Sequence, residues 1–276
     1  MKKIRICAGI VTYNPDIELL IKNINAISDQ VNKVIIVDNG SINWNNWSNR
    51  ILSKNVEIIR NRNNDGIAKA LNQICTYAVE NDYDYVLTLD QDSIAPLDLV
   101  EQLSVHMSKD TAIVAPNIVY RNNENYADNI TEGCEEVEWV ITSASLTNLS
   151  VWKELSGFDE RLFIDGVDRD FCIRARRNNY KIIKNYNVCL NHELGNLKCK
   201  KKFGRIVYVT NHSSIRKYYM ARNSIYLDYK LGLKTSKYYL GKLVLKTLLY
   251  ENNKIKKLSA IMKGIYDGNK MKEKIK

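Results

Sequence analysis

The chain has 276 residues, of which 45% are hydrophobic and 26% are charged, a composition typical of a folded globular protein with a sizeable core. No apolar run approaches the ~20 residues of a membrane span, and the opening MKKIR lacks the long apolar segment of a signal peptide, so we expect a cytoplasmic protein. The six cysteines include no Cys-x-x-Cys pair, which favours reduced thiols in that compartment.

The net charge of +10 is unevenly distributed along the chain. Residues 196–276 carry 21 Lys and Arg against 4 Asp and Glu, whereas the first 195 residues carry 20 against 27. A basic region that follows an acidic body indicates a polyanionic partner, either nucleic acid or an anionic membrane surface.

The first 41 residues predict a β-α-β unit, the building block of a parallel sheet. Residues 4–10 form a strand-like run that Pro15 stops, Asp16 opens a helix to about Ile27, and residues 34–37 form a second buried strand. Small polar residues follow both strands, where open α/β sheets bind ligands. The same residues also fit a role as simple turn formers. These residues are Asn14, Asp38, Asn39 and Gly40.

A third strand is predicted over residues 56–59 and a helix over residues 67–80. Asn64 and Gly66 lie between them. Glycine directly before a helix lets backbone N–H groups approach a ligand closely.

The strand predicted over residues 85–89 ends in two carboxylates, Asp90 and Asp92. Side chains two apart on an extended chain point to the same side, so these carboxylates repel each other unless a cation lies between them. Hard cations such as Mg²⁺ or Mn²⁺ prefer oxygen ligands and bridge phosphates. The alternative is an Asp-rich loop that caps the next helix.

The second half of the chain predicts further strands and helices and a change of character near Gly133. Alternation at Val137, Trp139 and Ile141 predicts an antiparallel strand that continues to residue 146. From His212 the chain reads as mostly helical and basic, which gives a domain of residues 1–210 followed by a basic helical region of residues 211–276. The other predicted elements are helix 96–107, strand 112–116, helix 150–157, helix 168–178 and strand 181–188.

Several short motifs occur together in a fixed order. They are Val11-Thr-Tyr-Asn14, Val37-Asp-Asn-Gly-Ser41, Asn64-Asp-Gly-Ile-Ala68 with Asn72, Asp90-Gln-Asp92, Gly157-Phe-Asp-Glu160, Phe163-Ile-Asp-Gly-Val-Asp168, His192-Glu-Leu-Gly195, Arg216-Lys-Tyr-Tyr-Met-Ala-Arg-Asn223 and Ala260-Ile-Met-Lys-Gly-Ile-Tyr-Asp-Gly268. Each motif is weak alone, but the ordered set resembles the inverting family 2 glycosyltransferases of the GT-A fold. The finer similarity is to bacterial rhamnosyltransferases of surface polysaccharides, including O-antigen. It is carried by the last four motifs and by Asp90-Gln-Asp-Ser93.

This resemblance implies an α/β fold with a mixed, mainly parallel sheet and assigns roles to residues. The implied donor-binding residues are Thr12, Tyr13, Asn14, Asp38, Asn64, Gly66, Asp90 and Gln91. The implied ligands of Mg²⁺ or Mn²⁺ are Asp92 and His192, although His192 also fits a loop histidine bonded to backbone. Asp165 and Arg222 are candidates for contacts with the acceptor or the diphosphate.

Inverting transfer to a sugar hydroxyl needs one general base, for which we choose Asp168. Asp168 matches the second residue of the family's Glu-Asp pair, with Val167 in the place of the first. The alternative is that Asp168 only caps its helix. Asp165 and Asp170 are weaker candidates, and Asp170 is spaced to pair with Arg174.

The leading hypothesis is therefore a metal-dependent transferase that moves L-rhamnose from dTDP-β-L-rhamnose to a glycan acceptor on a lipid carrier. One departure from the family is Ala144, where relatives often have glycine. If that glycine makes room for a sugar, the methyl group of Ala144 narrows the pocket, and a UDP-hexose stays open as the alternative donor. A different class, a nucleic-acid-binding protein acting through its basic end, lacks any helix-turn-helix, zinc or RNA-recognition signature, so we expect no nucleic acid partner.

The basic C-terminal region also predicts a location at the inner face of the cell membrane. Lys242 and Lys246 lie four apart among apolar residues, as in helices that rest in the headgroup region of anionic bilayers. The alternative is that the leucines pack on the rest of the protein and the lysines are solvated. The apolar residues concerned are Leu240, Leu243, Val244, Leu245, Leu248 and Leu249.

Overall fold

The computed structural model describes residues 4–51, 55–120, 132–192, 198–202 and 205–273. The chain divides into two compact units. The first contains Met1–Arg161 and Val167–His192, and the second contains Leu162–Gly166 and Glu193–Lys276. That residues 1–210 form a domain by themselves stays a prediction.

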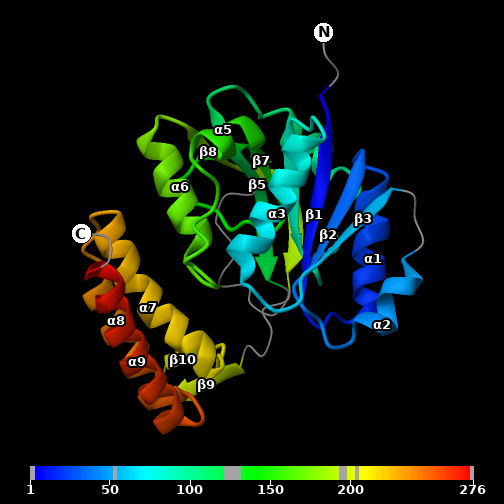
Figure 1. Ribbon diagram of the computed structural model, residues 1–276. Helices are drawn as coiled ribbons and strands as arrows, with labels where there is room; N and C mark the ends of the chain where they lie inside the picture. Colours follow the sequence, from blue (N-terminus) through cyan, green and yellow to red (C-terminus); the bar gives the residue numbers. More distant parts are fainter. Residues whose placement is uncertain (1–3, 52–54, 121–131, 193–197, 203–204, 274–276) are drawn as a thin grey trace. The chain divides into compact units, whose positions relative to one another are not determined.

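The first unit is built on one eight-stranded sheet in the order β3-β2-β1-β4-β7-β5-β8-β6 (Figure 1). Neighbours β3, β2, β1 and β4 are parallel, as are β5 and β8, while β7 is antiparallel to β4 and β5, and β6 to β8. The predicted mixed, mainly parallel α/β sheet is thus confirmed. The strands are β1 Ile6–Thr12, β2 Lys33–Asp38, β3 Val56–Arg60, β4 Tyr85–Asp90, β5 Thr111–Tyr120, β6 Cys134–Glu136, β7 Ser145–Asn148 and β8 Lys181–His192.

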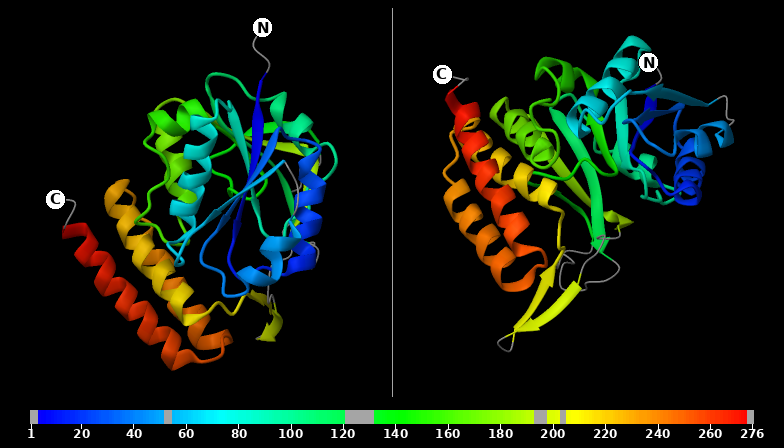
Figure 2. Two further views of the ribbon diagram at one scale, coloured as in Figure 1. Left: turned by 45° about the vertical axis from the view of Figure 1, so that its right-hand side comes forward. Right: turned by 60° about the horizontal axis from the view of Figure 1, so that its bottom comes forward.

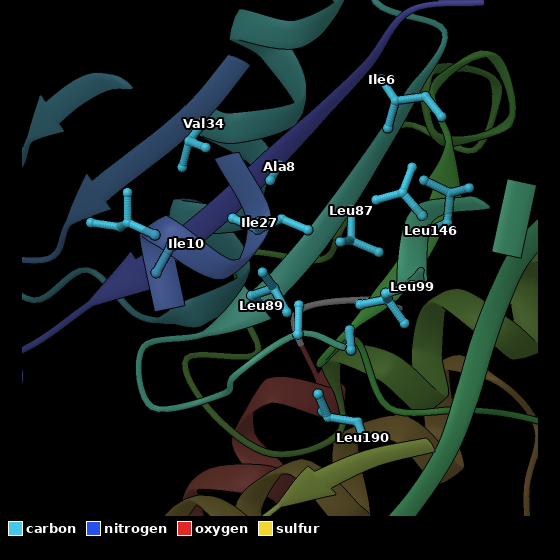
Figure 3. Packing of buried hydrophobic residues seen from close by; sticks show 14 of the residues in the cluster. Ile6, Ala8, Ile10, Ile27, Val34, Leu87, Leu89, Leu99, Leu146 and Leu190 are labelled. Carbon is cyan, nitrogen blue, oxygen red and sulfur yellow. The ribbon is translucent and has the colours of Figure 1, made fainter. Parts of the chain in front are cut away.

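Helices cover both faces of this sheet. The helical elements are α1 Ile17–Ser28, α2 Trp44–Trp47, η1 Ser48–Arg50, α3 Ile67–Glu80, α4 Leu99–Ser104, α5 Leu149–Glu154 and α6 Val167–Arg177. Ala8 and Ile10 of β1 belong to the core cluster with Ile27 of α1 and Leu99 of α4 (Figure 3). Because side chains alternate along a strand, the intervening Gly9 faces the other side, where a Cβ would meet Ile74 of α3.

The antiparallel strand predicted over residues 137–141 is wrong. Those residues are irregular, and the strand lies later, in β7. The Ser145 amide donates to the Thr142 carbonyl at 3.2 Å, and Ala144 between them has a left-handed φ of 57°, so a turn interrupts the run. Trp139 remains 49% exposed, which shows that the alternation did not report burial against the sheet.

Two predicted helices are shorter than the sequence suggested. The helix expected over residues 96–107 covers only α4, because Pro96 to Asp98 form a turn first. The helix expected to reach residue 157 ends at Glu154, and Ser156 and Gly157 then take φ values of 59° and 71°.

The second unit contains a hairpin of β9 (Lys198–Lys202) and β10 (Arg205–Val209) and three helices, α7 (Ser214–Lys230), α8 (Ser236–Tyr250) and α9 (Lys254–Glu273). The helices lie side by side (Figure 2) around a small core that includes Ala221, Leu243 and Ile261. The predicted helical C-terminal region is present, and the hairpin was not predicted. Among the described residues, no helix is long and apolar enough to cross a bilayer.

Close approach of α7 and α9 depends on two glycines, Gly264 and Gly268. A Cβ at Gly264 would overlap the carbonyl oxygen of Tyr218, and one at Gly268 would lie 2.7 Å from the carbonyl oxygen of Arg222. Any larger residue at either position would force the two helices apart.

Candidate active site

The carboxyl ends of β1, β2 and β4 bring the predicted donor-binding residues together. In the sheet register Thr12 lies opposite Asp38, and Val11 lies opposite Asp90. The Thr12 hydroxyl donates to Asp38 Oδ1 at 3.1 Å, and both residues are fully buried. The strand ends therefore form one continuous polar edge, where open α/β sheets bind ligands.

Hydrogen bonds between side chains and backbone amides hold the loops that leave this edge. Asp38 Oδ2 accepts from the Ser41 amide at 3.1 Å, and the Ser41 hydroxyl accepts from the Asn14 amide at 2.8 Å. Asn14, with a left-handed φ of 49°, accepts from the Ile42 amide through its side chain. Asn14 and Asp38 thus brace two loops of the site against each other.

Asn39, which the sequence predicted to be either a ligand-binding residue or a turn former, organises the β3–α3 loop. Its side-chain nitrogen Nδ2 donates to Asn64 Oδ1 and to the Gly66 carbonyl, both at 3.1 Å. Its Oδ1 accepts from the Asp65 amide and from Asn61 Nδ2, both at 3.2 Å. Since Asn39 is 3% exposed, these bonds fix Asn64 and Gly66 beside the end of β2. No spacing rule in the sequence signals this role.

The end of β4 carries Asp90, Gln91 and Asp92. The Ser93 amide donates to the Asp90 carbonyl at 3.1 Å and closes a tight turn that leaves Asp92 exposed and Asp90 half-buried. Gln91 Oε1 accepts from the Tyr13 amide at 2.8 Å, which ties this turn to the end of β1. The Tyr13 ring is 46% exposed, as an aromatic surface for a nucleobase would need to be.

The turn after β4 fits a divalent metal only together with a ligand. In the described residues no three His, Cys, Asp or Glu side chains are grouped for a metal. Mg²⁺ and Mn²⁺ are, however, commonly held by one or two carboxylates together with substrate phosphates and water. Asp92, with Asp90 beside it, suits that arrangement. His192 is the last residue of β8, and its side chain lies outside the described part of the structure.

Asp168 lies in the first turn of α6 and is half-buried. Because α6 begins at Val167, Asp168 is inside the helix rather than at the N-cap. β4 and β5 are both antiparallel to β7, and β5 is parallel to β8. β8 therefore runs in the same direction as β4. α6 packs on β8, which follows it, and begins at the edge of the sheet where β1, β2 and β4 end (Figure 1).

A second group of contacts holds the segment that precedes this helix. Asn72 of α3 donates to the Phe158 carbonyl at 2.9 Å and to Glu160 Oε1 at 3.0 Å, and it accepts from the Phe158 amide at 2.8 Å. Arg174 donates to the carbonyls of Leu155 and Gly157 at 2.6 and 2.7 Å. Asn72 was noticed in the sequence only as part of a motif, and its role here is to hold Gly157–Glu160.

Asp165 and Arg222 belong to the second unit. The Asp165 carboxylate accepts from Arg216 Nη2 at 2.9 Å, and Arg222 Nε donates to Asn223 Oδ1 at 2.9 Å. The Arg222 guanidinium also lies 4.7 Å from the centroid of the Tyr219 ring. Contacts of Asp165 or Arg222 with acceptor or diphosphate stay predictions.

Two solved structures share this fold over most of the chain. The chain superimposes on Staphylococcus aureus TarS in complex with UDP-GlcNAc with a TM-score of 0.62 and 14% identity, over 96% of this chain and 81% of that one. GalNAc-T7, solved with UDP, GalNAc and Mn²⁺, matches with a TM-score of 0.58 and 11% identity over 91% of this chain and 58% of its own. The sheet order and these structural matches define a fold of the GT-A type.

The sequence comparisons give the family. The model of glycosyl transferase family 2 matches residues 7–172. The dTDP-rhamnosyl transferase RfbF of Shigella flexneri is 30% identical over 240 residues, which are 80% of this chain and 79% of that protein. The chain belongs to glycosyl transferase family 2.

Proposed function

We propose that the protein is an inverting glycosyltransferase that uses dTDP-β-L-rhamnose and transfers L-rhamnose to a glycan hydroxyl. The observation that carries this proposal is the polar edge formed by Thr12, Asp38 and the Asp90–Asp92 turn, in a family 2 chain 30% identical to a dTDP-rhamnosyl transferase. That identity favours rhamnose over the UDP-hexose alternative.

The chemistry follows from one base and one leaving group. Asp168 takes the proton of the acceptor hydroxyl, while that oxygen attacks the anomeric carbon from the face opposite the diphosphate. The bond from the anomeric carbon to the diphosphate oxygen breaks, and its electron pair leaves with dTDP. A single displacement inverts the anomeric centre, so a β-linked donor gives an α-L-rhamnoside.

Donor binding divides between the nucleoside and the diphosphate. The Tyr13 ring offers a stacking surface for the base. Asp38, whose carboxylate is oriented by Thr12 and Ser41, is the proposed acceptor for the base N–H. Asp90 and Asp92 would hold a Mg²⁺ or Mn²⁺ ion together with the diphosphate. When bound, such an ion neutralises the charge that develops on the leaving group.

The acceptor is proposed to be carried on a lipid, with the enzyme resting on the inner face of the membrane. Several large apolar side chains of α8 and α9 are exposed, among them Tyr238 (71%), Leu245 (56%) and Tyr266 (60%). Lys242 lies 4.3 Å from the Tyr238 ring, and Lys270 lies 4.6 Å from the Tyr266 ring. Aromatic rings beside lysines suit an interface of anionic headgroups. Leu240, Leu243 and Val244 instead pack inside the second unit.

A donor screen tests the central proposal. Purified protein is mixed with Mn²⁺ and either dTDP-rhamnose or a series of UDP-hexoses, and thermal shift, donor hydrolysis and transfer to a rhamnan or hexose acceptor are measured. We expect a shift and turnover with dTDP-rhamnose and an α-linked product by NMR. Turnover with a UDP-hexose alone would overturn the donor assignment, and a β-linked product would overturn the inverting mechanism.

Flotation with liposomes tests the membrane proposal separately. We expect the full-length protein to bind vesicles that contain phosphatidylglycerol, to ignore neutral vesicles, and to detach as salt is raised. The double variant Tyr238→Ser/Leu245→Ser should float less while soluble transfer is retained. A protein that ignores anionic vesicles at low salt would contradict the proposal.

A further inference from the structure

The loop Leu162–Gly166 has an unusual place in the chain. It belongs to the second compact unit with α7, α8 and α9, yet Arg161 before it and Val167 after it belong to the first. The chain leaves the loop directly into α6, and Asp168 is only two residues beyond Gly166. Two residues span at most about 7 Å, so the position of the loop limits where Asp168 can lie.

Helix α7 holds the backbone of this loop through Asn223. The side-chain nitrogen Nδ2 of Asn223 donates to the carbonyls of Ile164 and Asp165, both at 2.8 Å. Asn223 is 2% exposed, and its Oδ1 accepts from Arg222 Nε at 2.9 Å, which fixes the orientation of the amide. Both donors of one buried side chain are therefore committed to two successive peptide groups.

Three further contacts with α7 hold the loop. Arg216 donates to both oxygens of Asp165, with Nη2–Oδ1 at 2.9 Å and Nε–Oδ2 at 3.2 Å. The ring of Phe163 stacks on that of Tyr219 with centroids 4.8 Å apart and planes 13° apart. A Cβ on Gly166 would lie 2.8 Å from Leu227 Cδ1, so the backbone rests against α7.

The backbone of the loop is itself strained. Asp165 and Gly166 have consecutive left-handed φ values of 65° and 89°. A non-glycine residue in this region persists only where surrounding contacts determine it. Here those contacts are the bonds of Arg216 and Asn223.

We infer that Arg216 and Asn223 are positioning residues for the transfer reaction, through which α7 sets the position of the general base Asp168. This inference rests on the proposed function, because it assigns Asp168 as the base. Proton transfer requires the base within hydrogen-bond distance of the acceptor hydroxyl, and a displacement of about 1 Å can cost about 100-fold in rate. Neither residue contacts the substrate in this role.

The test uses Asn223→Asp, which keeps the shape of the side chain and removes both donors, and Arg216→Lys, which keeps the charge and removes the two-pronged contact. Asn269→Asp is the matched control, because Asn269 is exposed on α9 and its amide donates to one carbonyl, that of Ile265. We expect kcat to fall about 10- to 100-fold in both loop variants, with donor affinity within about twofold of wild type and no change in the control.

A double-mutant cycle separates positioning from a general structural effect. If Asn223 acts through Asp168, Asn223→Asp added to Asp168→Asn should cost nothing further, because the base is already absent. Multiplied losses in the double variant would overturn the inference, as would wild-type kcat in Arg216→Lys and Asn223→Asp. If Asp168→Asn itself turns over normally, the base assignment fails instead. Arg216 is half-buried, so Arg216→Lys is expected to fold even if Asn223→Asp does not.

Discussion

Asp170 and Arg174, one turn apart on α6, form a buried ion pair in which Arg174 Nε donates to Asp170 Oδ2 at 2.8 Å. The Asp170 side chain is 0% exposed. The same Arg174 guanidinium, held in place by Asp170, also donates to the carbonyls of Leu155 and Gly157. This ion pair distinguishes the roles of the two carboxylates in the first turn of α6. Because Asp170 is buried and paired, its role is structural, and the role of general base is left to Asp168.

Asp168→Asn should fold normally, bind donor and lose transfer by roughly 10²–10⁴-fold, because the amide cannot accept the acceptor proton. Asp170→Asn should instead lower stability by about 3 kcal/mol, since it leaves Arg174 without its buried partner. Thermal unfolding and single-turnover transfer of both variants give the comparison. Near-normal turnover in Asp168→Asn with loss in Asp170→Asn or Asp165→Asn would show that another carboxylate is the base.

Asp92→Asn should abolish the increase in donor affinity that Mn²⁺ gives, because the exposed carboxylate after β4 is the proposed metal ligand. Donor titration by calorimetry with Mn²⁺ or with EDTA measures the effect. Asp98→Asn, an exposed carboxylate just before α4, serves as the control and should behave as wild type. Full activity of the wild-type protein in excess EDTA would rule out the metal role.

Ala144→Gly should change stability by less than about 1 kcal/mol. Relief of the left-handed φ of 57° is offset by the lost methyl and by the greater freedom of glycine in the unfolded chain. Ala144→Val, in contrast, should be strongly destabilised, because a β-branched residue does not tolerate this conformation. We expect no change of donor preference in Ala144→Gly. A shift towards UDP-hexoses would mean that the methyl narrows the sugar pocket, as the departure from the family first suggested.

Glu251→Gln should lower stability by about 3 kcal/mol, because Glu251 is the buried partner of two lysines. Its carboxylate accepts from Lys217 and, at 2.9 Å, from Lys257, and each of the three residues is at most 4% exposed. Burial lowers the pKa of Lys217, so loss of the carboxylate removes what keeps that charge stable. The exposed neighbour Lys256 supplies the control variant, Lys256→Met, whose melting temperature should match wild type.

His212 should make stability depend on pH below neutrality. Burial, and next the nearby Arg216, lower its pKa from 6.5 to about 4 in the folded protein. Between these two values the unfolded chain binds the proton and the folded chain does not, so stability falls as pH falls through this window. Urea midpoints from pH 5 to 7.5 should decline less steeply in His212→Asn than in wild type. Parallel curves for the two proteins would contradict the assignment.

The sequence determined the local elements and the residues that follow them. Buried strands such as residues 34–37 and 85–89 were predicted because a continuous apolar run is a local property of the chain. Thr12, Asp38 and Asp90 were predicted as site residues because polar residues at the ends of such strands are visible in the sequence. Ordered motifs also gave the family, which the comparisons confirm.

Tertiary structure decided which distant residues meet and what conformation their contacts impose. The pairing of Asp165 with Arg216 spans 51 positions, and the turn at Ala144 replaces a strand that alternation alone predicted. Asn39 and Asn223 show the same limit, since an asparagine that bonds four groups or two carbonyls has the same local sequence signal as one in a turn. Periodicity indicates which side chains are suited to burial. Whether they are buried, and which residues they then contact, depends on the sheet order and the helix packing.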